Sequence, residues 1–555
     1  MARKILIVGG VAGGASAAAR LRRLDETAQI IMFERGDHIC FANCGLPYYI
    51  GGTIKDRSDL LLQRPESFTQ RFNVEVRVKS EVVKINRQKK EVDVVEVATG
   101  EKYVEQYDKL ILSPGAEPAK PPVLGAEAGR VFTLRNLADT DRIAEFISVQ
   151  NPGRAVVVGA GYIGLEMAEN LADRGLRVEV VEVLDQVLPT LDREMADFLH
   201  DHLNEQGVTL WLGDGVSSFG QTASSVKVTL SSGRELDCDF AMLTTGVRPE
   251  VKLAKEAGLE IGTHAGIKVN AYLQTNDPDI YAIGDAVEVE DFVLGGATLI
   301  PLAGPANKQG RMAADNLCGK KRRYNGTQGT AILKVFGLTV GMTGASEKAL
   351  AKTNIDYEKL YLHPANHAGY YPDAKQMHIK LLFEKPGGGI LGVQIVGSDG
   401  VDKRIDVLAV AIRAGLTVFD LQELELAYAP PYGSGKDPVN MAGFAAANIL
   451  DGTVKVKHFN ELKEDDFVLD VRTPGEFARG SIPNAKNIYV NNLRSKLDEL
   501  PRDRTINVCC TVGFRSYIAC RILEQHGFDA RNLPGGYITY RTMANSGLSR
   551  LRSRR

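Results

Sequence analysis

Residues 4–14 have the sequence KILIVGGVAGG, in which an apolar strand runs directly into a glycine-rich turn. An alanine-rich helix is predicted over 15–24 and a second strand over 30–33, which ends at Glu34, 20 residues after the last glycine of the turn. This order predicts a βαβ unit whose helix N-terminus faces a pyrophosphate and whose acid binds a ribose hydroxyl. Val11 stands where the second glycine of the pattern is expected, so the turn departs from its ideal form.

The same pattern recurs later in the chain. A strand at 155–158 leads into GAGYIG at 159–164, a helix follows from Leu165, and a strand at 178–181 ends at Glu182. One such match is weak evidence, whereas two matches with strand, helix and acid in register indicate two dinucleotide sites. Glu182 is expected to bond a ribose 2′-hydroxyl and to repel a 2′-phosphate, which favours NADH over NADPH unless nearby arginines reverse the preference.

The bulk composition is that of a globular protein without a strongly charged partner. The length of 555 residues predicts about three to five domains, and 44% hydrophobic with 25% charged residues is ordinary. The formal net charge of −2 provides no general attraction to nucleic acid or to anionic membranes. No run of 18 apolar residues is present, and no cleavable signal is expected. The basic tail at 549–555 is expected to be a solvated end.

The seven cysteines are irregularly spaced, which argues against a disulfide framework and predicts a cytoplasmic protein with individually reactive thiols. None has a metal-ligand spacing with histidine, so no metal is expected. Two cysteines have distinctive surroundings: Cys44 lies in CFANCGLP at 40–47, and Cys510 opens CTVGFRS at 510–516. The first setting is typical of a flavin-linked redox thiol, and the second of a thiol that carries sulfur.

Residues 1–449 resemble the single-cysteine branch of the flavin-dependent disulfide reductases, specifically the coenzyme A-disulfide reductases and the NADH-dependent persulfide reductases. The shared motifs are the two glycine turns, the cysteine segment at 41–47, Thr275 with Gly284-Asp285, and YAPPY at 428–432. Residues 456–548 resemble a rhodanese domain. The motifs shared with that domain are DVR at 470–472, EF at 476–477, IPNA at 482–485, the Cys510 loop and LPGGY at 533–537.

The resemblance implies an α/β fold with two Rossmann-like nucleotide-binding domains, an α+β dimerisation domain and a C-terminal rhodanese-like α/β domain. The implied boundaries are 1–114 and 246–325 for the FAD-binding domain, 115–245 for the NAD(P)H-binding domain, 326–449 for the dimerisation domain and 456–548 for the rhodanese domain. Two strand-and-glycine segments, at 107–116 and 242–249, would carry the chain between the nucleotide-binding domains.

The resemblance also implies FAD and NADH, or NADPH, as cofactors. The positions that match the family's cofactor contacts are Gly9, Ala12, Gly13, Gly14, Glu34, Arg35, Asn43, Gly115, Gly159, Gly161, Tyr162, Ile163, Gly164, Glu166, Glu182, Gly246, Thr275, Gly284, Asp285, Pro301, Leu302 and Ala303. In the family the sulfur that matches Cys44 lies over the flavin ring, receives electrons from it and attacks a sulfur–sulfur bond. A lowered pKa of the Cys44 thiol would suit that attack.

A coenzyme A site is implied by the matching positions Ser16, Arg20, Arg23, Cys40, Asn43, Asn307 and Lys436. Arg20 and Arg23 are three residues apart on the predicted first helix and therefore share a face, where guanidinium groups suit phosphates. Taken alone, the same pair is also explained as a solvated basic face. Cys40 and Cys44 could form a dithiol, although the family's spacing for such a pair differs.

In the family, two tyrosines of a second subunit approach the active sulfur, which implies a homodimer. Tyr428 matches one of these tyrosines, and the other is Tyr370 or Tyr371.

Cys510 is the predicted sulfur carrier, because a glycine follows it by three residues and Arg515 by five. Such a loop turns its N–H groups toward the sulfur at the start of a helix. Cys509 is expected to be buried at the end of a strand. The remaining cysteines without supporting context, which are interpreted as structural, are Cys238, Cys318 and Cys520.

The predicted function is NAD(P)H-dependent reduction of coenzyme A persulfide, polysulfide or coenzyme A disulfide through Cys44, with sulfane sulfur carried on Cys510. One alternative is an NADH oxidase or peroxidase, although related peroxidases carry a histidine where Ala12 stands. Another is a regulatory rhodanese module without catalysis, although such modules commonly lack the loop cysteine. As a flexible chain, the linker at about 450–458 would span roughly 15–18 Å, which favours coenzyme A as the carrier between the two sulfurs.

Overall fold

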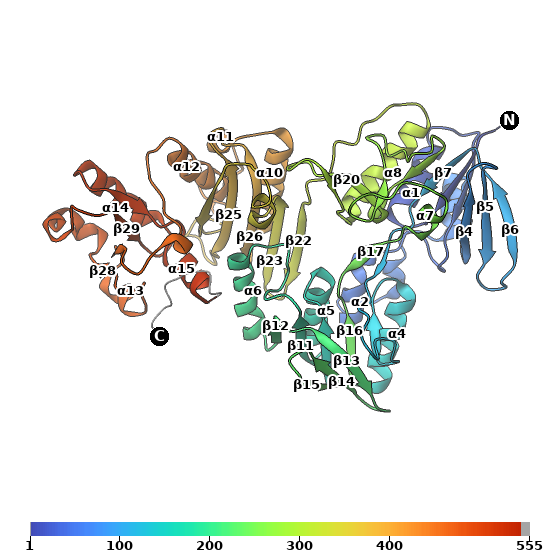
Figure 1. Cartoon of the computed structure of the whole chain (residues 1–555), viewed down its shortest axis with the longest axis horizontal. Helices are drawn as coiled ribbons and strands as arrows, with labels where there is room; N and C mark the ends of the chain where they lie inside the picture. Colours follow the sequence, from blue (N-terminus) through green and yellow to red (C-terminus); the bar gives the residue numbers. More distant parts are fainter. Residues whose placement is uncertain (1, 546–555) are drawn as a thin grey trace. The chain divides into compact units, whose positions relative to one another are not determined.

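The computed structural model describes residues 2–545 (Figure 1). The described chain forms two compact units. The first comprises the residues up to Val183 together with Gly213–Gly329, and the second comprises Leu184–Leu212 together with the residues from Thr330 onward. The basic tail and residues 546–548 of the predicted rhodanese domain lie outside the described residues. Within residues 2–545 no helix has both the length and the apolar character needed to cross a membrane.

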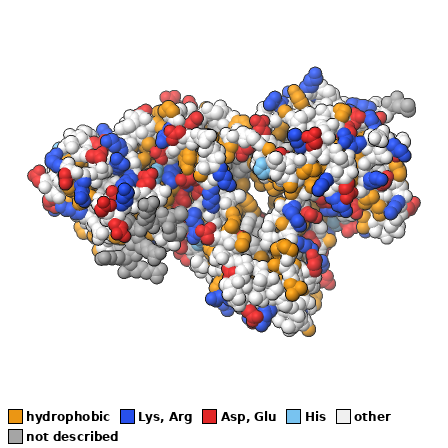
Figure 2. All heavy atoms as spheres, in the orientation of Figure 1, with side chains coloured by type: hydrophobic (Ala, Val, Ile, Leu, Met, Phe, Trp, Pro, Cys, Tyr) orange, Lys and Arg blue, Asp and Glu red, His pale blue; other side chains and the backbone are white. Residues whose placement is uncertain are grey.

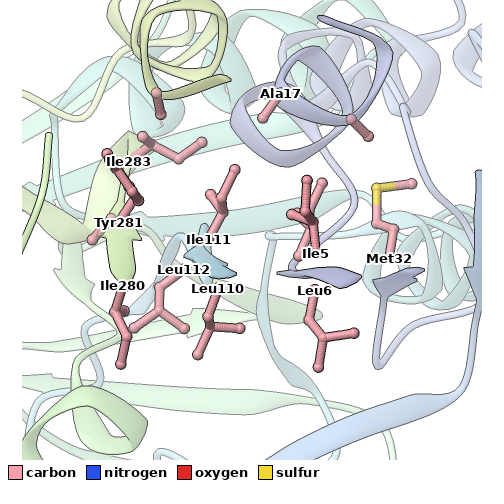
Figure 3. Packing of buried hydrophobic residues seen from close by; sticks show 14 of the residues in the cluster. Ile5, Leu6, Ala17, Met32, Leu110, Ile111, Leu112, Ile280, Tyr281 and Ile283 are labelled. Atoms are coloured by element: carbon pink, nitrogen blue, oxygen red, sulfur yellow. The ribbon is translucent and has the colours of Figure 1, made fainter. Parts of the chain in front are cut away.

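The first glycine turn lies at the end of a strand in a five-stranded parallel sheet of order β19-β7-β1-β2-β3. The strands are β1 (Lys4–Val8), β2 (Gln29–Phe33), β3 (Glu75–Arg77), β7 (Lys109–Leu112) and β19 (Ile280–Ala282). In Figure 3, Ile5 and Ile111 point toward helix α1 (Ala12–Arg22), which contributes Ala17, whereas Leu6 and Leu110 point to the opposite face. Both faces are therefore apolar, as expected for a parallel sheet that is covered on both sides.

The predicted strand at 4–8 is confirmed, and the next strand begins one residue earlier than predicted. Helix α1 begins at Ala12 and not at Ala15, because Gly13 and Gly14 form its first turn. The glycines of the motif thus belong to the helix N-terminus itself.

The second glycine turn lies in a parallel sheet in which β11, β10, β16 and β9 are neighbours in this order. Its elements are β9 (Val131–Thr133), α4 (Leu137–Gln150), β10 (Arg154–Val158), α5 (Tyr162–Asp173), β11 (Arg177–Glu182) and β16 (Phe240–Leu243). Strands β8 (Ala116–Pro118) and β17 (Val247–Pro249) pair antiparallel, so the two predicted connecting segments lie side by side.

The first unit contains further helices and strands. They are α2 (Leu46–Gly51), α3 (Pro65–Phe72), β4 (Ser80–Asn86), β5 (Glu91–Glu96), β6 (Lys102–Gln106), β13 (Val216–Gln221), β14 (Val226–Leu230), β15 (Glu235–Cys238), α7 (Lys252–Glu256), β18 (Ile267–Lys268), β20 (Val287–Glu290), β21 (Ala297–Thr298) and α8 (Ala303–Leu317).

The second unit contains an antiparallel sheet of order β22-β23-β26-β25-β24. The elements of this part of the unit are α6 (Arg193–Glu205), β12 (Thr209–Leu212), β22 (Ala331–Val335), β23 (Leu338–Gly344), α9 (Glu347–Leu350), β24 (Tyr357–Leu362), β25 (Met377–Glu384), β26 (Ile390–Gly397), α10 (Val401–Ala414), α11 (Val418–Glu423) and α12 (Pro438–Leu450). Strand β12 is not part of the antiparallel sheet. Helix α6 follows β11 in sequence but packs against β26 of this sheet.

The C-terminal part is a four-stranded parallel sheet of order β28-β27-β29-β30. Its elements are β27 (Phe467–Asp470), α13 (Pro474–Ala478), β28 (Lys486–Asn487), β29 (Ile506–Cys509), α14 (Phe514–Gln525), β30 (Ala530–Asn532) and α15 (Gly536–Asn545). Together with the two parallel sheets of the first unit and the antiparallel sheet, this part completes the predicted fold class.

The flexible-chain description of the linker is wrong. The Lys457 N–H donates to the Asn532 carbonyl at 3.0 Å, and the Asn532 N–H donates to the Lys455 carbonyl at 2.8 Å. Val454 and Phe459 at its ends are buried. Two apolar side chains and an unpaired sheet edge next to β30 therefore order the segment as an extra strand-like edge.

Charged side chains of both signs are interspersed over the face shown in Figure 2. This distribution agrees with the small net charge of −2.

Candidate functional site

The two glycine turns have nearly the same backbone geometry. Gly9 has a φ of +96° and Gly159 a φ of +102°, a region that favours glycine. A Cβ on Gly14 would lie 1.9 Å from the Gly9 carbonyl oxygen, and a Cβ on Gly164 would lie 1.9 Å from the Gly159 oxygen. In both copies the helix therefore approaches the strand end at a distance that only glycine permits, which leaves the helix N-terminus open to a phosphate.

The departure at Val11 has little effect on the backbone. Val11 has a φ of −95° at the N-cap of α1, and Gly161 has a φ of −77° at the N-cap of α5. Both values are accessible to residues with side chains, so the turn forms without the second glycine. The predicted contacts Ala12 and Gly13 lie in the first turn of α1, and Tyr162 and Ile163 lie in that of α5.

The two predicted ribose-binding acids also occupy equivalent positions. Glu34 Oε2 accepts the Gly10 N–H at 2.9 Å, and Glu182 Oε2 accepts the Ala160 N–H at 2.7 Å. Each carboxylate is thereby held at the mouth of its glycine turn.

Cys44 lies in a short 3₁₀ turn (Asn43–Gly45) that leads into α2, and it is solvent-exposed. The neighbouring Asn43 Oδ1 is buried and has no hydrogen-bond partner among the described residues. A buried polar atom without a partner is the kind of group that a bound ligand satisfies.

The protein chain by itself does not provide the lowered thiol pKa that would suit an attack by Cys44. Although the residue is exposed as a whole, partial desolvation of the sulfur by nearby protein atoms raises the pKa of the Cys44 thiol, and the carboxylates of Glu166 and Asp285 raise it further. The Arg135 guanidinium acts in the opposite direction. The two acids are predicted cofactor contacts, so negative charge at the same site opposes the thiolate.

Glu166 reaches this site from α5. The Tyr48 hydroxyl on α2 donates to Glu166 Oε1 at 3.4 Å. Burial raises the pKa of Glu166 to about 7, although the Tyr48 hydrogen bond opposes that shift. Helix α2 is held against α5 by a bond of 2.9 Å from Arg174 Nη1 to the Ile50 carbonyl.

Arg135 and Tyr48 are site residues that sequence reasoning missed. Arg135 Nη2 lies 3.5 Å from Asp285 Oδ2, and a Cβ on Gly115 would lie 3.0 Å from the same nitrogen. Arg135 thus brings the two predicted contacts Gly115 and Asp285 together. Neither Arg135 nor Tyr48 lies in a recognisable motif, so no signal in a single sequence identifies them.

Other predicted cofactor contacts are engaged within the chain. Arg35 forms two bonds to the Glu250 carboxylate, at 2.7 and 2.9 Å, and Thr275 Oγ1 donates to the Ile280 carbonyl at 2.9 Å. The Gly284 N–H donates to Gln309 Oε1 at 2.7 Å. Gly246 follows β16 with a φ of +100°. Pro301 and Leu302 directly precede α8, and Ala303 opens it.

The predicted coenzyme A contacts are only partly brought together. Ser16 Oγ lies 2.5 Å from Asn307 Oδ1, which joins α1 to α8. Arg20 Nε donates to Asp315 Oδ1 at 2.8 Å, whereas Arg23 is exposed at the end of the helix. The shared basic face is therefore reduced to one exposed arginine, because Asp315 neutralises the other.

Three predicted coenzyme A contacts remain, of which Asn43 has the buried, unpartnered oxygen described above. Burial raises the pKa of the Cys40 thiol to about 12, and Cys40 has a φ of +47°. Lys436 belongs to the second unit.

The two predicted active tyrosines meet on the second unit. The hydroxyl oxygens of Tyr370 and Tyr428 are 2.8 Å apart, and the residues are 76% and 51% exposed. Tyr371 instead packs edge-on against the His367 ring, with centroids 5.7 Å apart. The pairing therefore favours Tyr370 as the partner of Tyr428.

The Cys510 loop surrounds its sulfur with hydrogen-bond donors. Cys510 is fully buried, and its Sγ accepts the Gly513 N–H at 3.1 Å and the Ser516 hydroxyl at 3.4 Å. Helix α14 begins directly after Gly513, so its positive N-terminal end lies close to the sulfur. Two hydrogen-bond donors and the start of a helix therefore surround the sulfur at position 510.

Arg515 is fixed by a carboxylate. Its Nη1 and Nη2 donate to the Glu476 oxygens at 2.9 and 2.6 Å, and Thr511 Oγ1 donates to Glu476 Oε1 at 2.9 Å. The hydrogen bond from Arg515 holds the pKa of Glu476 well below its usual range. Glu476 of α13 therefore holds the Cys510 loop through Thr511 and Arg515.

The remaining cysteines differ in exposure. Burial raises the pKa of Cys509 well above its ordinary value, as expected for a strand-end residue. Cys238 and Cys520 are buried, and Cys318 is half-buried.

A buried acidic cluster in the second unit has the spacing of a metal site but holds a lysine. Asp192, Glu194 and Glu347 each offer a carboxylate oxygen to the others within 4.8 Å. The Lys380 ammonium lies 2.9, 2.5 and 2.6 Å from these three carboxylates and is itself fully buried. The ammonium occupies the position that a cation would need.

The two dinucleotide turns, the exposed Cys44 and the Cys510 loop define a nucleotide-linked sulfur oxidoreductase joined to a sulfur-carrier domain. The chain belongs to the pyridine nucleotide-disulphide oxidoreductase family, whose model matches residues 3–310. The family's dimerisation domain matches residues 330–436, and a rhodanese-like domain matches residues 455–541. Membership implies FAD and NADH or NADPH, and the two open helix N-termini and the unpartnered Asn43 oxygen fit such ligands.

Relatives match over most or all of their length. Coenzyme A disulfide reductase from Staphylococcus haemolyticus (strain JCSC1435) is 38% identical over 80% of this chain and 100% of its own. The crystal structure of reduced Bacillus anthracis CoADR-RHD is 50% identical, with a TM-score of 0.96 over 98% of this chain and 99% of its own. A NAD-dependent persulfide reductase from A. fulgidus is 37% identical, with a TM-score of 0.91 over 97% of this chain and 100% of its own.

Proposed function

We propose that this protein is an NAD(P)H-dependent reductase of coenzyme A persulfide, polysulfide or coenzyme A disulfide, with NADH preferred. Cys44 is the redox thiol, and Cys510 carries sulfane sulfur. The observation that carries the proposal is the presence in one chain of an exposed thiol beside two dinucleotide turns and a buried thiol in a donor-lined loop. Relatives of full length that are named for coenzyme A disulfide and for persulfide reduction support it.

In the proposed reaction the Cys44 thiolate attacks the sulfur–sulfur bond of the substrate. With coenzyme A persulfide, attack on the outer sulfur breaks that bond, leaves coenzyme A thiolate and places the sulfane sulfur on Cys44 as a persulfide. When bound, the flavin supplies the two electrons, taken from the nicotinamide nucleotide, that release this sulfur as hydrogen sulfide and restore the thiolate. Glu166 and Asp285 set the charge around the sulfur during these steps.

We also propose a homodimer in the cytoplasm. Tyr370 and Tyr428 form an exposed hydroxyl pair on the domain that the family uses for dimerisation, and such large exposed aromatic rings favour burial by a second subunit. Coenzyme A is the proposed substrate carrier, with Ser16, Arg23, Cys40, Asn43, Asn307 and Lys436 as its contacts. Arg20 joins them if coenzyme A displaces its bond to Asp315.

The Cys44→Ser variant tests the redox assignment. Because serine lacks the nucleophilic sulfur, sulfide release from coenzyme A persulfide should fall by more than about 10³-fold. Flavin content and flavin reduction by NADH, followed by absorbance, should stay unchanged because the two glycine turns are untouched. The matched control is Cys318→Ser, a half-buried cysteine at the end of α8, which should keep full turnover. Full sulfide release by Cys44→Ser would contradict the proposal.

A further inference from the structure

The Cys510 loop rests on the first turn of α15. The Tyr537 N–H donates to the Cys510 carbonyl at 2.7 Å, and the Ile538 N–H donates to the Thr511 carbonyl at 3.2 Å. A Cβ on Gly536 would lie 2.4 Å from the Cys510 carbonyl oxygen, so no side chain separates the helix from the loop. The position of α15 therefore sets the position of the sulfur-bearing residue.

Helix α15 is in turn anchored to the antiparallel sheet of the dimerisation domain. The Thr539 hydroxyl lies 2.8 Å from Nε2 of His363, and both residues are buried. The backbone of Gly535 also hydrogen-bonds the His363 ring. A Cβ on Gly535 would lie 2.7 Å from Tyr361 Cβ, so the turn before α15 lies directly on strand β24.

The His363 ring also contacts a second histidine, His378. Its Nδ1 lies 2.9 Å from Nδ1 of His378, and the His378 ring stacks on Phe198 of α6 with centroids 3.8 Å apart at 7°. Burial holds the pKa of His363 well below its ordinary value, and burial lowers the pKa of His378 to about 4. Both rings are therefore neutral, and a neutral imidazole has one donor and one acceptor nitrogen to satisfy its two neighbours.

We propose that His363, a residue of the dimerisation domain, is a positioning residue for the sulfur-carrying loop of the rhodanese-like domain, acting through Thr539 and the Gly535–Gly536 turn. The proposal rests on the proposed function of Cys510 as the sulfur carrier. It makes the reductase half of the chain part of the machinery that shapes the sulfurtransferase site. The rhodanese-like domain is then not an independent catalyst attached by a linker.

The test uses the full-length holoenzyme and two assays. One measures transfer of sulfane sulfur from glutathione persulfide to cyanide, which needs Cys510. The other measures NADH-dependent reduction of coenzyme A disulfide, which needs Cys44. The variant His363→Phe keeps an aromatic ring and removes both nitrogens. We expect kcat for sulfur transfer to fall about 10- to 100-fold, because small displacements of a reacting group have effects of this size. Disulfide reduction should stay within about twofold.

A second variant and a matched control separate positioning from general stability. Thr539→Val removes only the hydroxyl, should lower kcat in the same direction, and should not add to His363→Phe in the double variant because both remove the same bond. His458→Phe is the control, because His458 is equally buried and joins the two domains through Glu358 at 2.8 Å, yet its ring bonds no part of α15 or the loop. It should leave sulfur transfer unchanged.

Three results are distinguishable. Unchanged sulfur transfer in both His363→Phe and Thr539→Val would overturn the inference. Equal losses in His363→Phe and His458→Phe, in both assays, would show a merely structural role and would also overturn it. Sulfur transfer that survives in Cys510→Ala would instead overturn the proposed function of Cys510, whatever the histidine variants do.

Discussion

At the scale of single residues, the two reactive cysteines are surrounded in opposite ways. Cys510 is buried, and an N–H group, a hydroxyl group and a helix N-terminus surround its sulfur. Cys44 is exposed, and the carboxylates of Glu166 and Asp285 disfavour a negative charge on its sulfur. The proposed sulfur carrier Cys510 and the proposed redox thiol Cys44 therefore have different electrostatic environments.

Glu166 should control the reactivity of Cys44. Removing its charge in Glu166→Gln removes a group that raises the thiol pKa, so the pKa should fall. We expect the midpoint of the pH profile for alkylation by iodoacetamide, measured on the reduced holoenzyme, to shift down by about half a unit or more. At a pH below the midpoint, a shift of half a unit makes alkylation of the variant about threefold faster than that of the unmodified protein.

The control for this prediction is Asp173→Asn, an exposed acid at the end of the same helix α5. Its alkylation profile should match that of the unmodified protein. A Glu166→Gln profile with an unchanged midpoint would show that the carboxylate does not act on the sulfur.

Sequence motifs identified the candidate redox and cofactor-binding residues but not the residues that surround them. Glu34 and Glu182 follow from local patterns, because in each copy the strand, turn and acid lie within one βαβ unit, and Cys44 follows from the segment at 40–47. Tyr48 meets Glu166 across 118 positions of sequence, and His363 meets Thr539 across 176. Such pairs depend on how separate elements pack, and a single sequence contains no periodic signal for them.

At the scale of elements, the crossing of α1 and α8 fixes the first glycine turn. A Cβ on Gly310 of α8 would lie 2.3 Å from the Gly13 carbonyl oxygen of α1. The two helix backbones are therefore in direct contact, and this contact sets where the N-terminus of α1 points.

The Gly310→Ala variant should disturb this crossing. The added methyl group has no room, so the helices must separate at a cost of about 1–3 kcal/mol. We expect a lower midpoint of urea unfolding and weaker retention of FAD. Gly304→Ala, on the same helix with nothing within 4 Å of its Cβ, should be neutral or stabilise by up to about 1 kcal/mol. Equal midpoints for the two variants would contradict the account of the crossing.

Strands were the most predictable elements, because continuous apolar runs such as 4–8 and 506–509 are bounded by glycine or polar residues. Helix starts were less predictable, since glycines that are usually interpreted as a loop form the first turn of α1. The segment at about 450–458 was treated as a linker with the reach of a flexible chain. Its order comes from pairing with Asn532, which lies about 75 residues further along the chain.

At the scale of the whole molecule, the rhodanese-like domain shares a buried core with the dimerisation domain. Tyr361 of β24 belongs to the same apolar cluster as Phe459, Leu533 and Tyr540. The hydroxyl of Tyr361 also donates to Glu194 of α6 at 2.6 Å, inside the cluster centred on Lys380. These contacts hold the rhodanese-like domain on the dimerisation domain, which supports our proposal that coenzyme A, and not a swinging domain, carries sulfur.

In the proposed function, electrons from the nicotinamide nucleotide end on sulfane sulfur through Cys44. The most direct test is an anaerobic assay with coenzyme A persulfide that follows NADH oxidation and sulfide release together. We expect about one sulfide for each NADH oxidised, and loss of both signals in Cys44→Ser. NADH oxidation that needs oxygen or peroxide, without release of sulfide from the persulfide, would contradict the claim and indicate an oxidase or peroxidase instead.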